Sequence, residues 1–135
     1  MQDHLTIVVP IPPKATHPNN RPFTAMGARA KAAAAKRQRE DACIAALAEM
    51  NEPGRPYKPR WKNVTVQATF HRQGRQAKLM DLDNSIAWLK NSIDGLADAG
   101  VIENDRGVVP LPCSQLLGDA AKDNMVVILV KPIQG

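Results

Sequence analysis

The chain contains few cysteines, few aromatic side chains and no long apolar run, and each scarcity excludes a class of protein. Its two cysteines, Cys43 and Cys113, form no CxxC pair, which argues against a disulfide framework or a zinc site. The three histidines show no metal-ligand spacing either. No apolar run, MVVILV at 125–130 included, approaches the length of a membrane span. The amino-terminal MQDHLTIVVPIPP lacks the basic start and apolar stretch of a signal peptide, so we expect a cytoplasmic protein with no membrane partner.

The composition favours one basic domain. A length of 135 residues suits a single domain, so we expect residues 1–135 to fold as one unit. Apolar residues make up 44% of the chain and only five residues are aromatic, which predicts a core of aliphatic side chains and alanine. The net charge of +5 favours an anionic partner, most commonly nucleic acid. A protein that merely carries lysines fits the charge equally well.

The hydrophobic patterns predict three clear strands and two helices. LTIVV at 5–9 is β-branched and apolar and indicates a strand, which either stops at the prolines that follow or runs along an edge there. VTVQATFH at 64–71 alternates between apolar and polar residues, as a half-buried strand does. MVVILV at 125–130 indicates a strand buried on both faces or nearly so. Residues 28–50 and the segment from Asp83 to Gly100 have helical patterns, with Gly100 as a C-terminal cap.

These elements predict an α/β (α+β) fold, a small mixed sheet of about four strands with two helices. Residues 108–116 look extended but contain two prolines, which suggests an edge or irregular strand. The short link from 116 to 125 predicts that the last two strands form an antiparallel hairpin.

The first helix is rich in alanine and in positive charge. Its expected inner stripe consists of Ala32, Ala35, Cys43, Leu47 and Met50. Its first half carries five cations, namely Arg29, Lys31, Lys36, Arg37 and Arg39. These cations are either a solvated helix face or a surface that binds phosphates.

MDLDN at 80–84 places two carboxylates at the start of the second helix. One aspartate is enough to cap a helix, because a single side chain can bond the free N–H groups there. Asp81 and Asp83 together exceed that need, and they suit Mg²⁺, which prefers hard oxygen ligands. The preceding RQGRQAK at 72–78 is basic and would offset the negative charge for a polyanionic ligand.

Two further groups extend this acidic pair. At about 100° per residue, Lys90 and Asp94 fall on nearly the same side of the helix as Asp83, beside the apolar stripe. Lys90 and Asp94 also have the spacing of a simple surface ion pair. Asp105, in VIENDRG, follows the helix by a short turn, and Glu103 is the alternative there. Sequence spacing alone does not place Asp105 beside Asp81.

MDLDN, a helix with Lys90 and Asp94, LADAG and then ENDRGVV together resemble the core of the RusA-type Holliday junction resolvases. The opening VVPIPPKATHPNNR resembles the strand, double proline and asparagine-bearing loop at the start of that family. The resemblance spans most of the chain in order, and the DxDN-to-acidic-turn block is its specific part. It implies a RusA-like fold, a homodimer and a phage or prophage protein of a bacterial or phage-infected cell.

The resemblance also implies an activity and a site. The activity is Mg²⁺-dependent cleavage (with Mn²⁺ as a substitute) that resolves four-way DNA junctions by paired nicking in recombination and repair. Asp81, Asp83 and Asp105 would hold the metal, and Lys90 would be the catalytic lysine. The expected DNA contacts are Arg72, Arg75, Lys78, Asn20, Arg21 and Lys14.

Two positions depart from the family pattern. Lys90 follows Asp83 by seven residues, where the pattern has four, so it lies about one helical turn further along. Asn104 stands where an aspartate is typical. These departures keep two alternatives open: a non-catalytic, degenerate branched-DNA-binding protein of prophage origin, and a plain α/β interaction domain whose aspartates only cap a helix.

Overall fold

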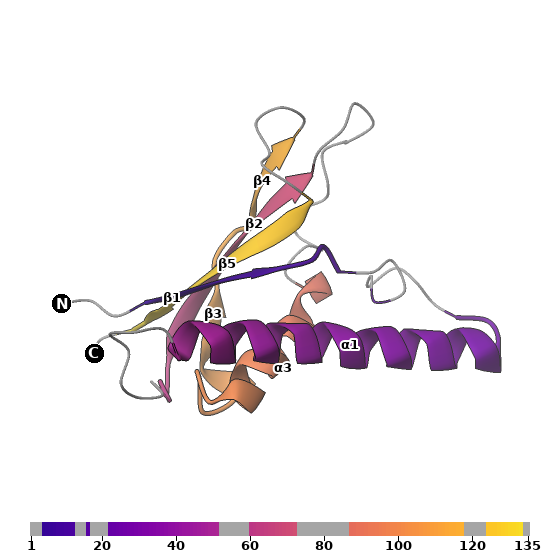
Figure 1. The fold of residues 1–135 in the computed structure, drawn as a ribbon, viewed down its shortest axis with the longest axis horizontal. Helices are drawn as coiled ribbons and strands as arrows, with labels where there is room; N and C mark the ends of the chain where they lie inside the picture. Colours follow the sequence, from indigo (N-terminus) through magenta and orange to yellow (C-terminus); the bar gives the residue numbers. More distant parts are fainter. Residues whose placement is uncertain are drawn as a thin grey trace.

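The computed structural model describes residues 4–12, 16, 22–51, 60–72, 87–117 and 124–133, which form a five-stranded sheet with two helices against it (Figure 1). The strands are β1 (Leu5–Val9), β2 (Val64–Arg72), β3 (Val108–Pro110), β4 (Ser114–Leu117) and β5 (Met125–Pro132). The helices are α1 (Ala25–Met50) and α3 (Lys90–Ala99), and a short 3-10 turn, η2, spans Asp105–Gly107. The predicted α+β class with a mixed sheet and two helices is confirmed.

The order of the strands corrects the predicted hairpin. The sheet runs β1-β5-β2-β3, with β4 also paired to β2. β5 lies antiparallel between β1 and β2, whereas β3 and β4 both run parallel to β2. The last two strands therefore do not pair with each other. β5 takes the central position because its apolar side chains can be covered there, and the prolines between 108 and 116 divide that stretch into two short edge segments.

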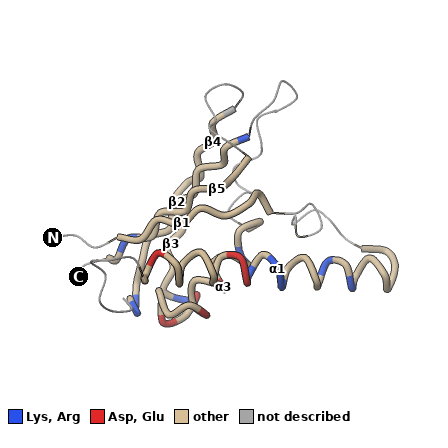
Figure 2. Tube along the Cα trace, in the orientation of Figure 1, with Lys and Arg blue, Asp and Glu red and all other residues tan. Residues whose placement is uncertain are grey.

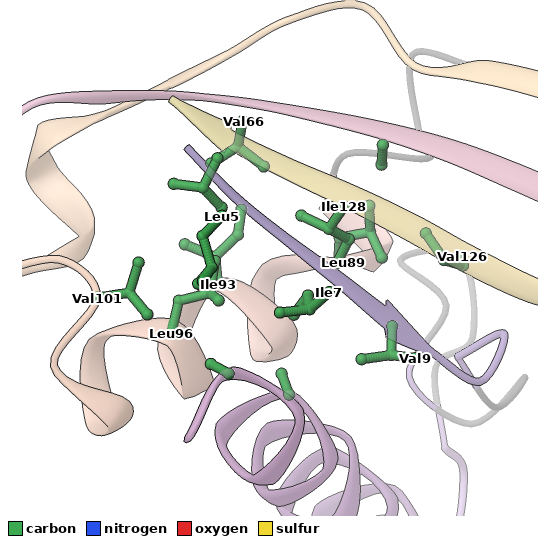
Figure 3. Packing of buried hydrophobic residues seen from close by; sticks show 14 of the residues in the cluster. Leu5, Ile7, Val9, Val66, Leu89, Ile93, Leu96, Val101, Val126 and Ile128 are labelled. Carbon is green, nitrogen blue, oxygen red and sulfur yellow. The ribbon is translucent and has the colours of Figure 1, made fainter. Parts of the chain in front are cut away.

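The core lies between one face of the sheet and the two helices. The alternation predicted for β2 is confirmed, because Val64, Val66, Ala68 and Phe70 are all fully buried. Figure 3 shows the contributions of β1, β5 and α3 meeting in this layer. The side chains labelled there are Leu5, Ile7, Val9, Val66, Leu89, Ile93, Leu96, Val101, Val126 and Ile128.

The buried stripe of α1 differs from the predicted one. Its buried residues are Gln38, Ala42, Ala46 and Met50, all in the second half of the helix. Of the predicted stripe, Met50 is buried and Cys43 and Leu47 are partly buried against the core, whereas Ala32 and Ala35 are not part of it. Cys43 is half-buried rather than buried. The pattern was ambiguous because alanine occupies several faces of this helix, which leaves no sharp apolar stripe to read.

The two helices approach each other closely at Gly95. A Cβ added there would collide with the carbonyl oxygen of Arg39 and lie 2.9 Å from the Cβ of Ala42. Glycine therefore permits the contact between α3 and α1 at this position. α3 ends at Ala99 and is capped by Gly100, whose φ of 87° is left-handed, as the predicted C-terminal cap requires.

Candidate metal and phosphate site

Three of the predicted site residues lie within the described residues, namely Lys90, Asp105 and Arg72. The others fall on positions outside them: Asp81, Asp83, Arg75, Lys78, Lys14, Asn20 and Arg21. The predicted helix start at Asp83 lies outside them as well. Arg72 is the last residue of β2 and is half-buried. β2 thus ends where the basic segment begins, and α3 follows the acidic segment.

Backbone hydrogen bonds after α3 hold the chain that leads to Asp105 next to the sheet. The N–H groups of Arg60 and Trp61 donate to the carbonyl groups of Gly100 and Val101, at 3.1 and 3.0 Å. The N–H of Glu103 then donates to the carbonyl of Trp61 at 3.0 Å. Residues 100–103 are therefore held beside the chain that enters β2. The turn that carries Asp105 therefore lies next to the sheet.

Asn104 fixes the turn that presents Asp105. Its Oδ1 accepts a hydrogen bond from the N–H of Arg106 at 2.9 Å, so it caps η2. An amide oxygen can fill this capping role as a carboxylate does. Gly107 completes the turn in tight contact, since an added Cβ would collide with the carbonyl oxygen of Lys62. The departure at position 104 is therefore compatible with an exposed Asp105.

Lys90, Asp94 and Asp105 line one pocket. Its volume is about 300 Å³, and its remaining walls are apolar: Ala87, Ile93, Val108 and Pro110. Lys90 and Asp105 are exposed and Asp94 is half-buried. The pocket therefore combines one cation and two carboxylates with walls from α3, η2 and β3.

Lys90 begins α3 immediately after a turn at Leu89. Trp88, one residue earlier, stacks on Phe70 near the end of β2, with ring centroids 6.1 Å apart. From the other side, the Nε2 of Gln38 donates to the carbonyl of Trp88 at 2.8 Å and to the Oγ of Ser92 at 3.2 Å. The first turn of α3 is thus held by both β2 and α1.

Asp94 was placed on this side of the helix by its spacing from Lys90, but it was not predicted to belong to the site. The two residues are one turn apart and share a face. Among the ion pairs of the described residues none joins Lys90 to Asp94, so the surface pair that their spacing allows is not formed. Asp94 could have been included in the predicted site because it lies on the same side of the helix as Lys90.

A neighbouring ion pair anchors α1 to the other end of α3. The guanidinium of Arg39 donates two hydrogen bonds to the carboxylate of Asp98, at 2.5 and 2.7 Å. This contact lowers the pKa of Asp98, first through the hydrogen bond and then through the charge of Arg39. It raises the pKa of Arg39, chiefly through the same hydrogen bond, with a smaller contribution from Asp94. Arg39 is thereby engaged within the protein.

A second pocket lies on the opposite side of α3, between α1 and the end of β1. Its volume is about 280 Å³, and its polar lining consists of Arg37, Gln38, Asp41 and Ser92. It contains none of the residues predicted to hold the metal or to act in catalysis. The pocket with Lys90 and Asp105 is therefore the candidate site.

The described residues of that pocket fit a hard divalent cation only in part. Asp94 and Asp105 offer carboxylate oxygens, the ligand type that Mg²⁺ prefers. Two carboxylates can suffice for Mg²⁺, which keeps several of its waters. Within the part of the chain that the structure describes, no group of three or more His, Cys, Asp or Glu residues is placed to hold a metal. Further ligands would have to come from the DLDN segment just before α3.

No family model matches the chain, and the search of curated proteins also finds no match. Among the described residues, none of the helices has the length and apolar character needed to span a bilayer.

Proposed function

We propose that the chain is a magnesium-dependent, structure-selective endodeoxyribonuclease of the RusA type that resolves Holliday junctions by paired nicking. The motif order DxDN, helix with lysine and aspartate, and acidic turn motivates the proposal. The observation that carries it is the pocket at the start of α3, where Lys90 and Asp105, fifteen residues apart in the sequence, line one cavity. Neither helix capping nor a solvated surface requires these two side chains to converge.

The residues of the pocket have separate tasks in phosphodiester hydrolysis. Lys90 binds the scissile phosphate and stabilises the negative charge that grows in the transition state. Asp105, with Asp81 and Asp83 from the segment before α3, would hold Mg²⁺, and Asp94 adds a fourth carboxylate beside Lys90. The bound ion would acidify a water and neutralise phosphate charge.

Cations next to the site supply affinity for the DNA backbone. Arg72, Arg75 and Lys78 precede the acidic segment directly in the sequence. Their contacts would be with phosphates, so they set a salt-dependent affinity and carry no base specificity. A homodimer would place two such sites on a four-way junction, which has two strands to cut symmetrically.

Cleavage of a synthetic four-way junction tests the proposal. The full chain is incubated with the labelled junction in Mg²⁺ and, separately, in EDTA, at several salt concentrations. We expect paired nicks in Mg²⁺ only, and linear duplex of the same sequence should not be cut. Absence of metal-dependent nicking at every salt concentration would refute the nuclease and leave the non-catalytic DNA-binding alternative if the junction is still bound.

Carboxamide variants test the assignment of the carboxylates. Asp81→Asn and Asp83→Asn should abolish nicking while junction binding is retained, because the carboxylates hold the metal and the cations hold the DNA. Asp98→Asn is the matched control, since Asp98 lies on the same helix as Lys90 but is engaged with Arg39. Normal nicking by the Asp81 and Asp83 variants would show that the site has been assigned to the wrong residues.

A further inference from the structure

The first half of α1 extends away from the rest of the fold. The helix has 26 residues, about 39 Å at 1.5 Å per residue. Its buried residues all lie from Gln38 onwards, so nothing in the first half is packed into the core. Figure 1 shows this half passing beyond the sheet and α3. Among the described residues, this half of the helix contributes no side chain to the core, and Arg29 and Lys36 on it are exposed.

The direction of this half is set by the contacts between α1 and α3. Gln38 bonds to Trp88 and Ser92 near the start of α3, and Ala42 lies against Gly95 further along. The two helices therefore run in the same direction. The first half of α1 extends past the amino-terminal end of α3, which is the end that carries Lys90 (Figure 1).

The charge on this half has one sign. Between Ala25 and Arg39 the sequence contains no acidic residue, and Figure 2 shows Lys and Arg positions recurring along it. Arg29 and Lys36 are seven residues apart, which places them on the same side of the helix about 10 Å apart along its axis. That separation corresponds to about three nucleotides along one DNA strand. Arg29 is exposed, and Lys36 is 79% exposed with its ammonium 4.0 Å from Glu40.

We propose that residues 25–37 of α1 form an arm that binds the phosphate backbone of a DNA duplex leaving the candidate site. Small alanines between the cations let a phosphate backbone approach the helix closely. The inference rests on the proposed function, because it names where the DNA beyond the cleaved bond would lie. Phe23 and Met26, 100% and 80% exposed at the tip, make a second copy of the chain the competing occupant.

The salt dependence of junction binding tests the arm. The variant Arg29→Gln/Lys36→Gln removes two cations from one side of it, and glutamine keeps a good helix former at both positions. The control Lys62→Gln/Lys131→Gln removes the same charge from the chain just before β2 and from the end of β5, which pairs with the start of β2. Figure 1 shows these strand ends at the opposite end of the fold from the first half of α1. Binding of a labelled four-way junction is measured by anisotropy in EDTA between about 50 and 200 mM salt.

We plot the logarithm of the association constant against the logarithm of the salt concentration. For the arm variant we expect this plot to fall less steeply than for the wild type, by about two units of slope, because each lost phosphate contact removes about one unit. The control should lower it by clearly less. Equal slopes for the two variants would overturn the arm. A change of oligomeric state in the arm variant alone, measured by sedimentation, would also overturn it in favour of a second copy.

Nicking by the wild type in Mg²⁺, assayed on the same preparations, separates the two proposals. If the wild type nicks the junction and the two variants have equal slopes, the proposed DNA binding by the arm is refuted and the proposed nuclease activity is supported. If the wild type binds the junction but never nicks it, the proposed nuclease activity is refuted. The salt dependence of binding by the two variants still tests whether the arm binds DNA. A wild type without salt-dependent binding overturns both.

Discussion

The side-chain amide of Gln38 donates a hydrogen bond to the backbone carbonyl of Trp88, at 2.8 Å, across fifty residues of sequence. The same nitrogen reaches the Oγ of Ser92 at 3.2 Å. Gln38 is 6% exposed, so these bonds form away from water. Lys90 lies between the two residues that Gln38 holds. A buried amide on α1 therefore secures the helical turn that carries the candidate phosphate-binding lysine.

Gln38→Met should loosen that turn. The substitution keeps an unbranched side chain of similar length but removes the hydrogen bonds that Gln38 donates to the Trp88 carbonyl and the Ser92 hydroxyl. Loss of a partner by a buried polar group typically costs about 1–3 kcal/mol. We expect a lower free energy of unfolding in urea. We also expect a slower single-turnover nicking rate with unchanged junction affinity, because Lys90 would be less well positioned.

Ser92→Ala is the matched control for this change. It removes only the weaker of the two bonds and leaves the one to Trp88 in place. Its effects on stability and nicking should both be smaller. If Gln38→Met matches the wild type in both measurements, the bond to Trp88 has no positioning role.

Gly95→Ala should destabilise the protein although alanine is the better helix former. Propensity alone predicts a gain of about 1 kcal/mol in a helix interior. The added methyl group would meet the backbone carbonyl of Arg39 and the Cβ of Ala42, neither of which can rotate away. Overpacking of this kind typically costs about 1–3 kcal/mol. Urea denaturation should therefore show a net loss of stability.

Gly27→Ala provides the comparison within α1. There the new methyl group would lie 3.2 Å from side-chain atoms of Pro22 and Thr24 at an exposed helix end, where the neighbours can adjust. Its cost should be clearly smaller than that of Gly95→Ala. Equal stability of the Gly95 variant and the wild type would mean that the two helices can separate without penalty.

An element was predictable where its apolar residues recur with a single period and lie on one face. The strict alternation from Val64 to Phe70 predicted β2, and the left-handed Gly100 was predicted from its place after α3. The pairing of β5 was not predictable in the same way. Its side chains are apolar at nearly every position, so the pattern does not show which strands pair with it. A short link to the preceding strand suggested a hairpin, but the most apolar strand took the centre of the sheet.

The sequence allowed Lys90 and Asp105 to be identified as candidates, but it did not predict that they line one cavity. Lys90 was identified from its helix, and Asp105 from the acidic turn that follows. Their convergence depends on the hydrogen bonds that hold residues 100–103 against Arg60 and Trp61, and no sequence spacing encodes that pairing. Asp94 was seen as part of a polar line, but its membership of the pocket required the position of Asp105.

Lys90→Ala should lower the nicking rate in Mg²⁺ much more than it lowers junction affinity. The lysine is one cation among many for binding, but it is the cation that shares the pocket with Asp94 and Asp105. Loss of a preorganised charge at a transition state typically costs about 10²–10³-fold in rate. Single-turnover nicking with saturating protein measures this, and Lys131→Ala on β5 is the control for loss of charge outside the pocket. Nicking at the wild-type rate would remove Lys90 from the mechanism.

The two cysteines should differ sharply in reactivity towards a thiol reagent. Cys113 is 5% exposed, and burial raises the pKa of its thiol, while a backbone hydrogen bond at Ala68 acts in the opposite direction. A raised thiol pKa keeps the unreactive protonated form to higher pH, and its contribution to stability is complete below the unfolded pKa and is lost as pH rises through the folded one. Cys43 is only half-buried on α1. N-ethylmaleimide labelling of the native protein at pH 7, read by peptide mass, should modify Cys43 first and Cys113 only on unfolding. Equal native labelling rates would contradict the packing of Cys113 beside β2.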